Sequence, residues 1–337
     1  MTDTPDGLSF LPLGGTGEIG MNFNLYRLTK NNKETWLAID CGIGFSGNDT
    51  PEAEVLMPDP TFIADRAKDL CGLVITHAHE DHLGAVAHLW PYLRCPVYAT
   101  PFAAAVLRRK LHEAHLVNQV KIHVVMPSSR FHVGPFDLQF VAVTHSVAEA
   151  QAVALRTPHG LIVHTGDWKL DENPLVGPKT DLEEFGRLGD EGVLAMVGDS
   201  TNVMKEGRSE SEADVRKGLT DLITSLHGRV AVTCFASNVA RVESIAKAAM
   251  AAGRAVMIVG RSLRNLETAA RECGYFSDLP PFLTEQDARD VHDDNLLMII
   301  TGSQGEPRSA LSRIASDTHP NISLGEGETV IYSSRMI

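Results

Sequence analysis

Four side chains with metal-binding chemistry crowd into one short stretch of the chain, "VITHAHEDHLGAV". An apolar run from Leu73 to Thr76 predicts a strand, and His77, His79, Asp81 and His82 follow it directly. Residues two apart on an extended segment project to the same side, so His77 and His79 are placed to bind one ion. Asp81 and His82, where a helix begins, point to a second position close by. Imidazole and carboxylate ligands of this kind suit zinc or a similar divalent ion.

A site for two ions needs more ligands than this stretch provides, and two further residues are candidates. His145 ends the predicted strand "LQFVAVTH", and Asp167 follows the predicted strand "LIVHTGD". Alone, a His or Asp at a strand end is more often a turn or cap residue. The chain has 14 histidines, so a surface cluster is the alternative to a metal site, but the dense order of the pattern after a buried strand favours the metal site. His164 lies inside its strand and is expected to be a hydrogen-bonded core residue.

A glycine-rich stretch, "LGGTGEIGMNF", raises the possibility of a dinucleotide site. It contains G-x-G-x-x-G at Gly15, Gly17 and Gly20, and Asp40 follows about 20 residues later. That fingerprint holds a pyrophosphate only if the last glycine opens a helix. The residues that follow, "MNFNLYRL", instead alternate apolar and polar side chains, which predicts a strand. The glycines are therefore expected to join two strands, and NAD is not an expected cofactor.

The first half of the chain consists of short apolar runs separated by turns. The predicted strands are 8–13, 35–40, 71–77, 95–100, 120–125, 136–145 and 151–157. Helices are predicted after His82 and after Pro101, because proline suits the first turn of a helix. Many strands with few helices indicate an α/β sandwich rather than a doubly wound sheet.

Beyond Asp199 the pattern changes to long helices that alternate with continuous apolar runs. The predicted helices are 211–226, 238–253 and 262–274, and the predicted strands are 229–236, 255–260 and 295–302. This alternation is typical of βαβ units around a buried parallel sheet. A boundary near 200–208 therefore predicts two domains, 1–203 and 204–337.

Bulk properties limit the class of protein. With 30 basic and 43 acidic residues the net charge is -13, so there is no global attraction to nucleic acid or to an anionic membrane. The N-terminus does not read as a signal peptide, and no apolar run reaches the roughly 18 residues of a membrane span. A cytoplasmic protein is expected, with reduced thiols at Cys41, Cys71, Cys95, Cys234 and Cys273.

The motifs together resemble a known family. A strand-end Asp40, the H-x-H-x-D-H stretch, a later His and a later Asp resemble the metallo-β-lactamase fold. The segments "LGGTGEIGMN", "THSV", "GDSTN", "FASNVARV", "GRSL" and "TGSQGEPRSAL" occur in an order and spacing similar to those of the ribonuclease J family of β-CASP nucleases. The resemblance covers essentially the whole chain. It implies an αββα metallo-β-lactamase sandwich followed by an α/β β-CASP domain.

The resemblance also implies roles for particular residues. One ion would be held by His77, His79 and His145, and another by Asp81 and His82, with Asp167 as the bridge. Asp199 in "GDSTN" matches the first β-CASP motif and is expected, with Asp81, to be catalytic. Glu18 and Asn22 would be structural residues near the site, and Asp40 would orient the metal loop. Candidate phosphate contacts at predicted strand exits, where capping is the alternative role, are Ser237, Asn238, Arg261, Ser262, Ser303 and Gln304.

The implied function is RNA degradation by two-metal phosphodiester hydrolysis. The expected activity is 5′-3′ exonuclease on 5′-monophosphate RNA together with endonuclease activity. Two Zn²⁺ ions, or Mn²⁺, are the expected cofactors, RNA the substrate, and a homodimer or homotetramer without membrane contact the expected assembly. The family's last lactamase strands, two histidine motifs and C-terminal domain are expected after Ile337, and Ala240 stands where the family pattern has a histidine.

Two other functions stay open from sequence. A small-substrate hydrolase of the same fold, such as a thioesterase or lactonase, is disfavoured because a small substrate needs no long second half. A catalytically impaired RNA-binding protein is disfavoured because all the expected ligands within the chain are intact.

Overall fold

The computed structural model describes residues 5–45, 53, 55–207, 209–306 and 308–334. The chain divides into two compact units, which are described separately. Unit 1 comprises residues 1–145, 149–170 and 178–208, and unit 2 comprises residues 146–148, 171–177 and 209–337.

Unit 1 contains two principal β-sheets. The first has the order β1-β2-β3-β6-β7-β8, antiparallel through β3 and parallel from there on. Its strands are β1 Gly7–Gly14, β2 Phe23–Lys30, β3 Lys33–Ile39, β6 Leu70–Val74, β7 Val97–Ala99 and β8 Ile122–Val124. The second has the order β13-β12-β11-β10-β9, with β13 parallel to β12 and the other pairs antiparallel. Its strands are β9 Arg130–Val133, β10 Phe136–Ala142, β11 Gln151–Thr157, β12 Gly160–His164 and β13 Val193–Val197, and a separate short pair joins β4 Gly44–Phe45 to β5 Val55–Leu56.

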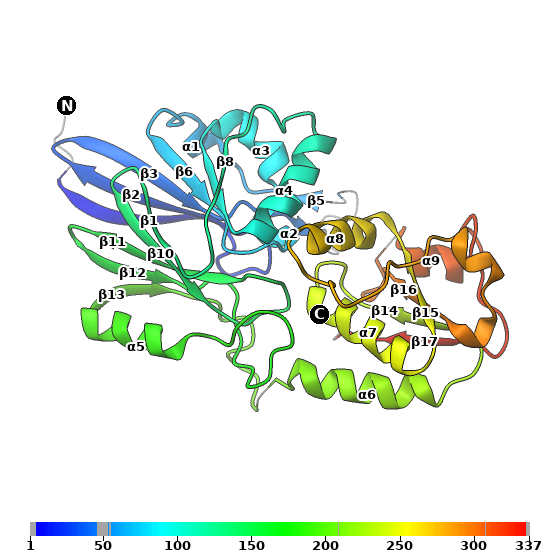
Figure 1. The fold of residues 1–337 in the computed structure, drawn as a ribbon. Coiled ribbons are helices and arrows are strands. Elements are labelled where there is room, and N and C mark those ends of the chain that lie inside the picture. Colours follow the sequence, from blue (N-terminus) through cyan, green and yellow to red (C-terminus); the bar gives the residue numbers. More distant parts are fainter. Residues whose placement is uncertain (1–4, 46–52, 54, 208, 307, 335–337) are drawn as a thin grey trace. The chain divides into compact units, whose positions relative to one another are not determined.

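The core of unit 1 lies between these two sheets. Alternate residues of the first sheet, such as Leu37 and Ile39, pack against residues of the second, such as Leu138, Phe140 and Val153, all fully buried. Helices α1 and α4 lie on the outer side of the first sheet and α5 on that of the second (Figure 1). The helices of this unit are α1 Thr61–Ala64, α2 Glu80–Leu83, α3 Val86–Leu93, α4 Pro101–Glu113 and α5 Leu182–Glu191. The expected αββα sandwich is thus confirmed.

Unit 2 is built around a parallel sheet of order β15-β16-β14-β17. Its strands are β14 Val230–Thr233, β15 Ala255–Val259, β16 Leu296–Ile300 and β17 Thr329–Tyr332, and its helices are α6 Glu212–Thr224, α7 Val239–Ala251, α8 Arg261–Glu272 and α9 Ala310–Ala315. Two 3₁₀ turns, η1 Asp287–Asp290 and η2 Asp293–Asn295, precede β16. Helix α7 connects β14 to β15, and α8 connects β15 to β16, so the two connections cross the sheet in opposite directions. Because such connections are right-handed, α7 and α8 lie on opposite faces of the sheet.

The glycine-rich stretch connects β1 to β2, and no helix follows Gly20. The glycines thus join two strands, β1 and β2, as predicted. Several boundaries differ from expectation. The strand predicted to reach His77 ends at Val74, the strand predicted to reach His145 ends at Ala142, and the helix predicted after His82 is split into α2 and α3.

Strand β13 lies at the edge of the second sheet and is not among the predicted strands. It is apolar throughout, "VLAMV", yet Leu194 is 61% exposed and Met196 is 71% exposed. Its inner edge pairs with β12, and among the described residues no strand pairs with its outer edge.

Candidate metal centre

The expected ligands of unit 1 all follow strand ends. The chain leaves β6 at Val74 and reaches α2 at Glu80, so His77 and His79 lie on the short connection between them. His145 lies between β10 and β11, and Asp167 follows β12. Because these connections belong to both sheets of the sandwich, side chains from distant parts of the sequence meet at one site.

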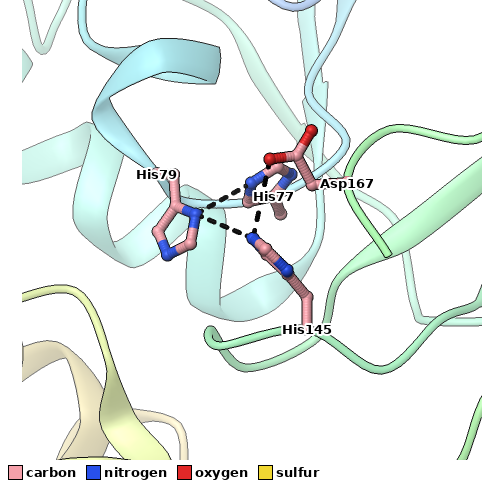
Figure 2. A group of neighbouring side chains, drawn as sticks. All are labelled: His77, His79, His145 and Asp167. Carbon is pink, nitrogen blue, oxygen red and sulfur yellow. Dashed lines mark hydrogen bonds and ion pairs between the residues drawn. The ribbon is translucent and has the colours of Figure 1, made fainter. Parts of the chain in front are cut away.

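His77, His79, His145 and Asp167 form the first group, and their ligand atoms all lie within 4.8 Å of one another. Figure 2 shows their side chains converging. Nδ1 of His79 lies 3.1 Å from Nε2 of His77 and 3.0 Å from Nε2 of His145. Oδ2 of Asp167 lies 3.7 Å from Nε2 of His145. Three nitrogens and one oxygen that face a common point make a donor set that fits zinc or a related divalent ion.

Asp81, His82 and Asp167 form a second group, again with ligand atoms within 4.8 Å of one another. Nε2 of His82 lies 3.2 Å from Oδ1 of Asp167 and 3.5 Å from Oδ2 of Asp81. Asp167 thus presents one oxygen to each group. The two groups together form a candidate site for divalent metal ions, and Asp167 belongs to both groups.

The carboxylate of Asp40 contacts the second ring nitrogen of His82, Nδ1. The side chain of Asp40 is fully buried, and its Oδ2 lies 2.7 Å from Nδ1 of His82. The same carboxylate accepts hydrogen bonds from the backbone N–H and the hydroxyl of Thr76, each at 2.8 Å. With Nδ1 engaged by a carboxylate, Nε2 is the nitrogen left for a metal, an arrangement common around metal-bound histidines.

Burial sets the protonation of the first group. It lowers the pKa of His79 to about 3 and that of His145 to about 4, and it holds the pKa of His77 well below its ordinary value. These imidazoles are therefore neutral at neutral pH, the form that binds metal. Burial also acts to lower the pKa of His82, but the nearby carboxylates of Asp40 and Asp167 outweigh it and raise the pKa.

Backbone hydrogen bonds join the segment that carries the second group to two other segments of the chain. Cys41 N–H donates to the carbonyl of His82 at 2.7 Å, Ile43 N–H to that of Glu80 at 2.9 Å, and Asn22 N–H to that of Asp81 at 3.0 Å. The approach is close at Gly42, where an added Cβ would lie 1.7 Å from the carbonyl oxygen of Asp81. A glycine is required here because any side chain would push the ligand segment away.

The loop of His145 is anchored by a residue that sequence reasoning missed. Glu149 has a φ of 60°, and its Oε2 accepts the backbone N–H of Phe102 at 2.8 Å, near the start of α4. The helix N-cap, Thr100, makes no side-chain cap of its own. Two residues further on, Gln151 N–H donates to the carbonyl of Thr76 at 3.1 Å. The His145 loop is thus tied both to α4 and to the segment that carries His77.

The remaining expected residues of unit 1 lie outside the two groups. Asp199 follows β13, its backbone N–H donates to the hydroxyl of Thr165, and its Oδ1 accepts the N–H of Thr201. Glu18 accepts the N–H of Gly15 and so braces the glycine-rich loop. His164 is buried with its Nδ1 2.9 Å from the hydroxyl of Tyr26, which confirms it as a hydrogen-bonded core residue.

The expected phosphate contacts belong to unit 2, at the carboxyl edge of its parallel sheet. They follow β14 (Ser237 and Asn238), β15 (Arg261 and Ser262) and β16 (Ser303 and Gln304). Asn238 caps α7 by accepting the N–H of Arg241, so it has the structural role that was its alternative. Arg261 and Ser262 are exposed in the first turn of α8, whose N-cap makes no side-chain hydrogen bond. The hydroxyl of Ser303 is buried and has no hydrogen-bond partner among the described residues.

Comparison with protein families gives two matches. Residues 35–179 match the beta-lactamase superfamily domain, and residues 227–337 match the domain described as "Ribonuclease J, beta-CASP domain". The first range contains all six expected ligand residues.

Curated relatives match over nearly the whole chain. "Ribonuclease J" of Sinorhizobium meliloti is 44% identical over 98% of this chain and 58% of that protein. "Ribonuclease J" of Mycolicibacterium smegmatis is 42% identical over 99% of this chain and 59% of that protein. The chain therefore spans somewhat under three fifths of the length of these relatives.

A solved structure shares the fold at low identity. A protein of unknown function from Enterococcus faecalis V583 matches with a TM-score of 0.61 at 16% identity, over 97% of this chain and 89% of that chain. In the part of the chain that the structure describes, no helix is long and apolar enough to cross a membrane.

Proposed function

The chain belongs to the ribonuclease J family, with a metallo-β-lactamase fold and a β-CASP domain, and on that premise we propose that it acts in a divalent-metal-dependent ribonuclease. The proposed reaction is hydrolysis of phosphodiester bonds, 5′-3′ from a 5′-monophosphate end and also internally. The observation that carries it is the pair of ligand groups that share Asp167.

Different residues would hold the two metal positions in such a reaction. When bound, a pair of divalent ions supplies positive charge for the scissile phosphate and lowers the pKa of a shared water. His77, His79 and His145 would hold the first position, and Asp81 and His82 the second. Asp167 would fix the separation of the two positions, because each of its oxygens faces a different group.

Proton handling is assigned to carboxylates. We propose Asp81 as the group that accepts or returns a proton at a carboxylate oxygen, since it is half-buried and lies beside His82. Asp199 is proposed as a second catalytic carboxylate because it matches the first β-CASP motif and is tied through Thr165 to the segment that carries Asp167.

RNA binding is proposed for the β-CASP domain, residues 204–337. Ser237, Asn238, Arg261, Ser262, Ser303 and Gln304 are the proposed phosphate contacts, supported by their place at one sheet edge and by the unpartnered hydroxyl of Ser303. Backbone N–H groups at the start of α8 add donors suited to an anion. With a net charge of -13, local groups such as these and bound cations have to provide the attraction for RNA.

The identity of the metal, the assembly and the compartment are proposed from the family resemblance. Zn²⁺ is the proposed metal, with Mn²⁺ as the alternative, and both the histidine-rich first group and the carboxylate-rich second group are compatible with them. A homodimer or homotetramer is proposed as the assembly. None of the five cysteines forms a disulfide, in keeping with the reducing cytoplasm where we propose that the protein acts.

The direct test uses RNA that carries a 5′-monophosphate and a 5′ label, incubated with this chain and Zn²⁺ or Mn²⁺. Release of labelled mononucleotide by the wild type, and its loss in Asp81→Asn, is the expected result. A 5′-triphosphate RNA of the same sequence serves as the control for the end that is recognised, and internal fragments from it would report endonuclease activity.

Two outcomes would contradict the proposal. Hydrolysis of a thioester or lactone with no RNA cleavage would indicate a small-substrate hydrolase. RNA binding that is unchanged in Asp81→Asn, with metal shown to be bound and no cleavage by a chain of the relatives' full length, would indicate an impaired RNA-binding protein.

A further inference from the structure

Trp168 differs from the other two tryptophans of the chain in its exposure. Trp36 is 4% exposed and packs its ring against that of Phe62. Trp90 is 9% exposed and donates its indole N–H to the carbonyl of Cys95 at 2.7 Å. Trp168 is 40% exposed, and within the described residues no aromatic side chain packs on its ring. Its indole is therefore not part of a packed core and is accessible to a ligand.

Trp168 also directly follows the residue that belongs to both ligand groups, Asp167. Adjacent Cα atoms are only about 3.8 Å apart, so the indole is attached at the edge of the candidate metal centre. The next residue, Lys169, forms an antiparallel bridge with Thr144, which precedes His145. The exposed ring is thus carried by a segment that adjoins ligand residues on two different connections of unit 1.

Hydrogen bonds fix the backbone that carries the ring. The N–H of Lys169 donates to the carbonyl of Thr144 at 2.8 Å, and the carbonyl of Lys169 accepts the hydroxyl of Thr180 at 2.9 Å. That hydroxyl oxygen in turn accepts the backbone N–H of Thr144 at 2.9 Å. Because the backbone is held and a tryptophan side chain has only two rotatable bonds, little conformational freedom is lost when a ligand contacts the ring.

A nucleobase has the chemistry that matches this arrangement. In the proposed reaction a phosphate of single-stranded RNA lies at the metal centre, and the bases next to it present their π faces. Aromatic side chains bind such bases by stacking, which is worth about tenfold in affinity per base and tolerates any sequence. Stacking needs no positive charge on the protein, so it adds affinity for RNA to a chain with a net charge of -13.

We propose that Trp168 binds RNA by stacking on a nucleobase next to the phosphate that is held at the metal centre. The contact adds affinity that is shared by all four bases, and the metal ligands still carry the hydrolysis. This inference rests on the proposed ribonuclease function.

The test measures binding of a 3′-labelled oligoadenylate with a 5′-monophosphate by fluorescence anisotropy, in the Asp81→Asn background so that the RNA stays intact. Trp168→Leu keeps an apolar side chain without a π face, and we expect about tenfold weaker binding. Trp168→Phe keeps a π face and should bind within about threefold of the parent. The loss in the leucine variant should be the same at low and high salt, since stacking releases no counterions.

Three results of this titration overturn the proposal. They are unchanged binding in Trp168→Leu, an equal loss in the leucine and phenylalanine variants, and a loss that disappears at high salt. Tyr92→Leu is the matched control, because Tyr92 is a 59% exposed aromatic residue on α3. An equal loss in Tyr92→Leu would assign the effect to exposed aromatic residues in general and would also overturn the role of Trp168.

Steady-state cleavage by the otherwise wild-type chain separates this inference from the proposed function. We expect Trp168→Leu to raise KM about tenfold, because the stacked base contributes to binding of the substrate. Cleavage by the wild type with an unchanged KM in Trp168→Leu overturns this inference alone. A wild type that neither binds nor cleaves RNA overturns the ribonuclease function as well.

Intrinsic tryptophan fluorescence of the wild type, with a chelator to prevent cleavage, covers the case in which the variants fail to fold. Because Trp36 and Trp90 are buried, quenching by oligoadenylate is expected to come from Trp168. An abasic ribose-phosphate oligomer of the same length should bind without quenching. Equal quenching by the two oligomers, or no quenching at concentrations of oligoadenylate that saturate the anisotropy signal, overturns the proposal.

Discussion

Oδ2 of Asp40 and Nδ1 of His82 lie 2.7 Å apart, and both side chains are almost fully withdrawn from solvent. The contact joins the end of β3 to α2, and it leaves Nε2 of His82 as the ring nitrogen that faces Asp81 and Asp167. Asp40 thus connects the fold of the first sheet to the chemistry of the second position.

Replacing Asp40 with Asn should weaken the second metal position by about 10- to 100-fold, the usual effect of losing the partner of a ligand histidine. The amide retains the volume of the carboxylate but removes the charge that stabilises His82. Titration calorimetry of metal-free Asp40→Asn measures the loss, and an unaffected second equivalent would show that His82 is oriented by other contacts.

Gly42→Ala should displace the ligand segment, since the new Cβ would lie 1.7 Å from the Asp81 carbonyl oxygen. We expect a drop in unfolding free energy of at least about 2 kcal/mol, at the upper end for single substitutions. Gly186→Ala is the matched control, because that glycine lies within α5 with no atom near its added Cβ.

The same change at Gly186 should stabilise the protein by about 0.5–1 kcal/mol, since alanine favours the helix. Urea unfolding of the two variants gives both values. Equal unfolding free energies for the Gly42→Ala and Gly186→Ala variants would contradict the prediction, since they would mean that the segments of Gly42 and Asp81 can move apart at no cost.

Glu149→Ala should cost about 1 kcal/mol of unfolding free energy, the typical value of a helix N-terminal cap. Glu149→Gln keeps an acceptor for the N–H of Phe102 and should lose only the smaller interaction of a charge with the helix dipole. Metal titration of the Glu149→Ala variant distinguishes an effect on the α4 cap alone from an effect on the His145 loop. If Glu149 anchors the His145 loop, the alanine variant binds the first equivalent more weakly, and unchanged binding would confine Glu149 to capping α4.

Acidification should destabilise the metal-free protein as pH falls below about 6.5, the unfolded value for histidine. Burial lowers the folded pKa of His79 to about 3 and of His145 and His164 to about 4, so the unfolded chain takes up these protons first. Each such group lowers stability by up to about 1.4 kcal/mol per pH unit between the two pKa values. His82 acts in the opposite sense, because its pKa is raised, so its contribution is lost as pH rises above about 6.5.

Urea midpoints with a chelator at pH 7, 6 and 5 test this dependence. His164→Gln retains a polar partner for Tyr26 and should reduce the slope by about one proton. A slope that is the same with and without His164 would mean that this histidine is protonated in the folded protein.

The sequence allowed the convergence of these candidate ligands to be predicted because their signal is local. His77, His79 and His82 follow one apolar strand at fixed spacing, and Asp167 follows another, so strand ends alone predict convergence. The role of Glu149 left no such signal, since it depends on contact with Phe102, tens of positions away.

Helix α5 was missed for a different reason. "LEEFGRLGDE" contains two glycines, which weaken helix propensity, and the helix is stabilised instead by the Asp181 cap and by packing on β13. The run "VLAMV" has the composition of a buried strand, and composition alone does not reveal that β13 has only one partner strand in the described sheet.

In concentrated solution we expect the outer edge of β13 to promote association. The outer edge of β13 offers backbone donors and acceptors in a row, flanked by the exposed side chains of Leu194 and Met196. We therefore expect two molecules to pair edge to edge through β13 at high concentration. A single lysine in place of Met196 should raise the concentration at which the protein precipitates without altering its metal content.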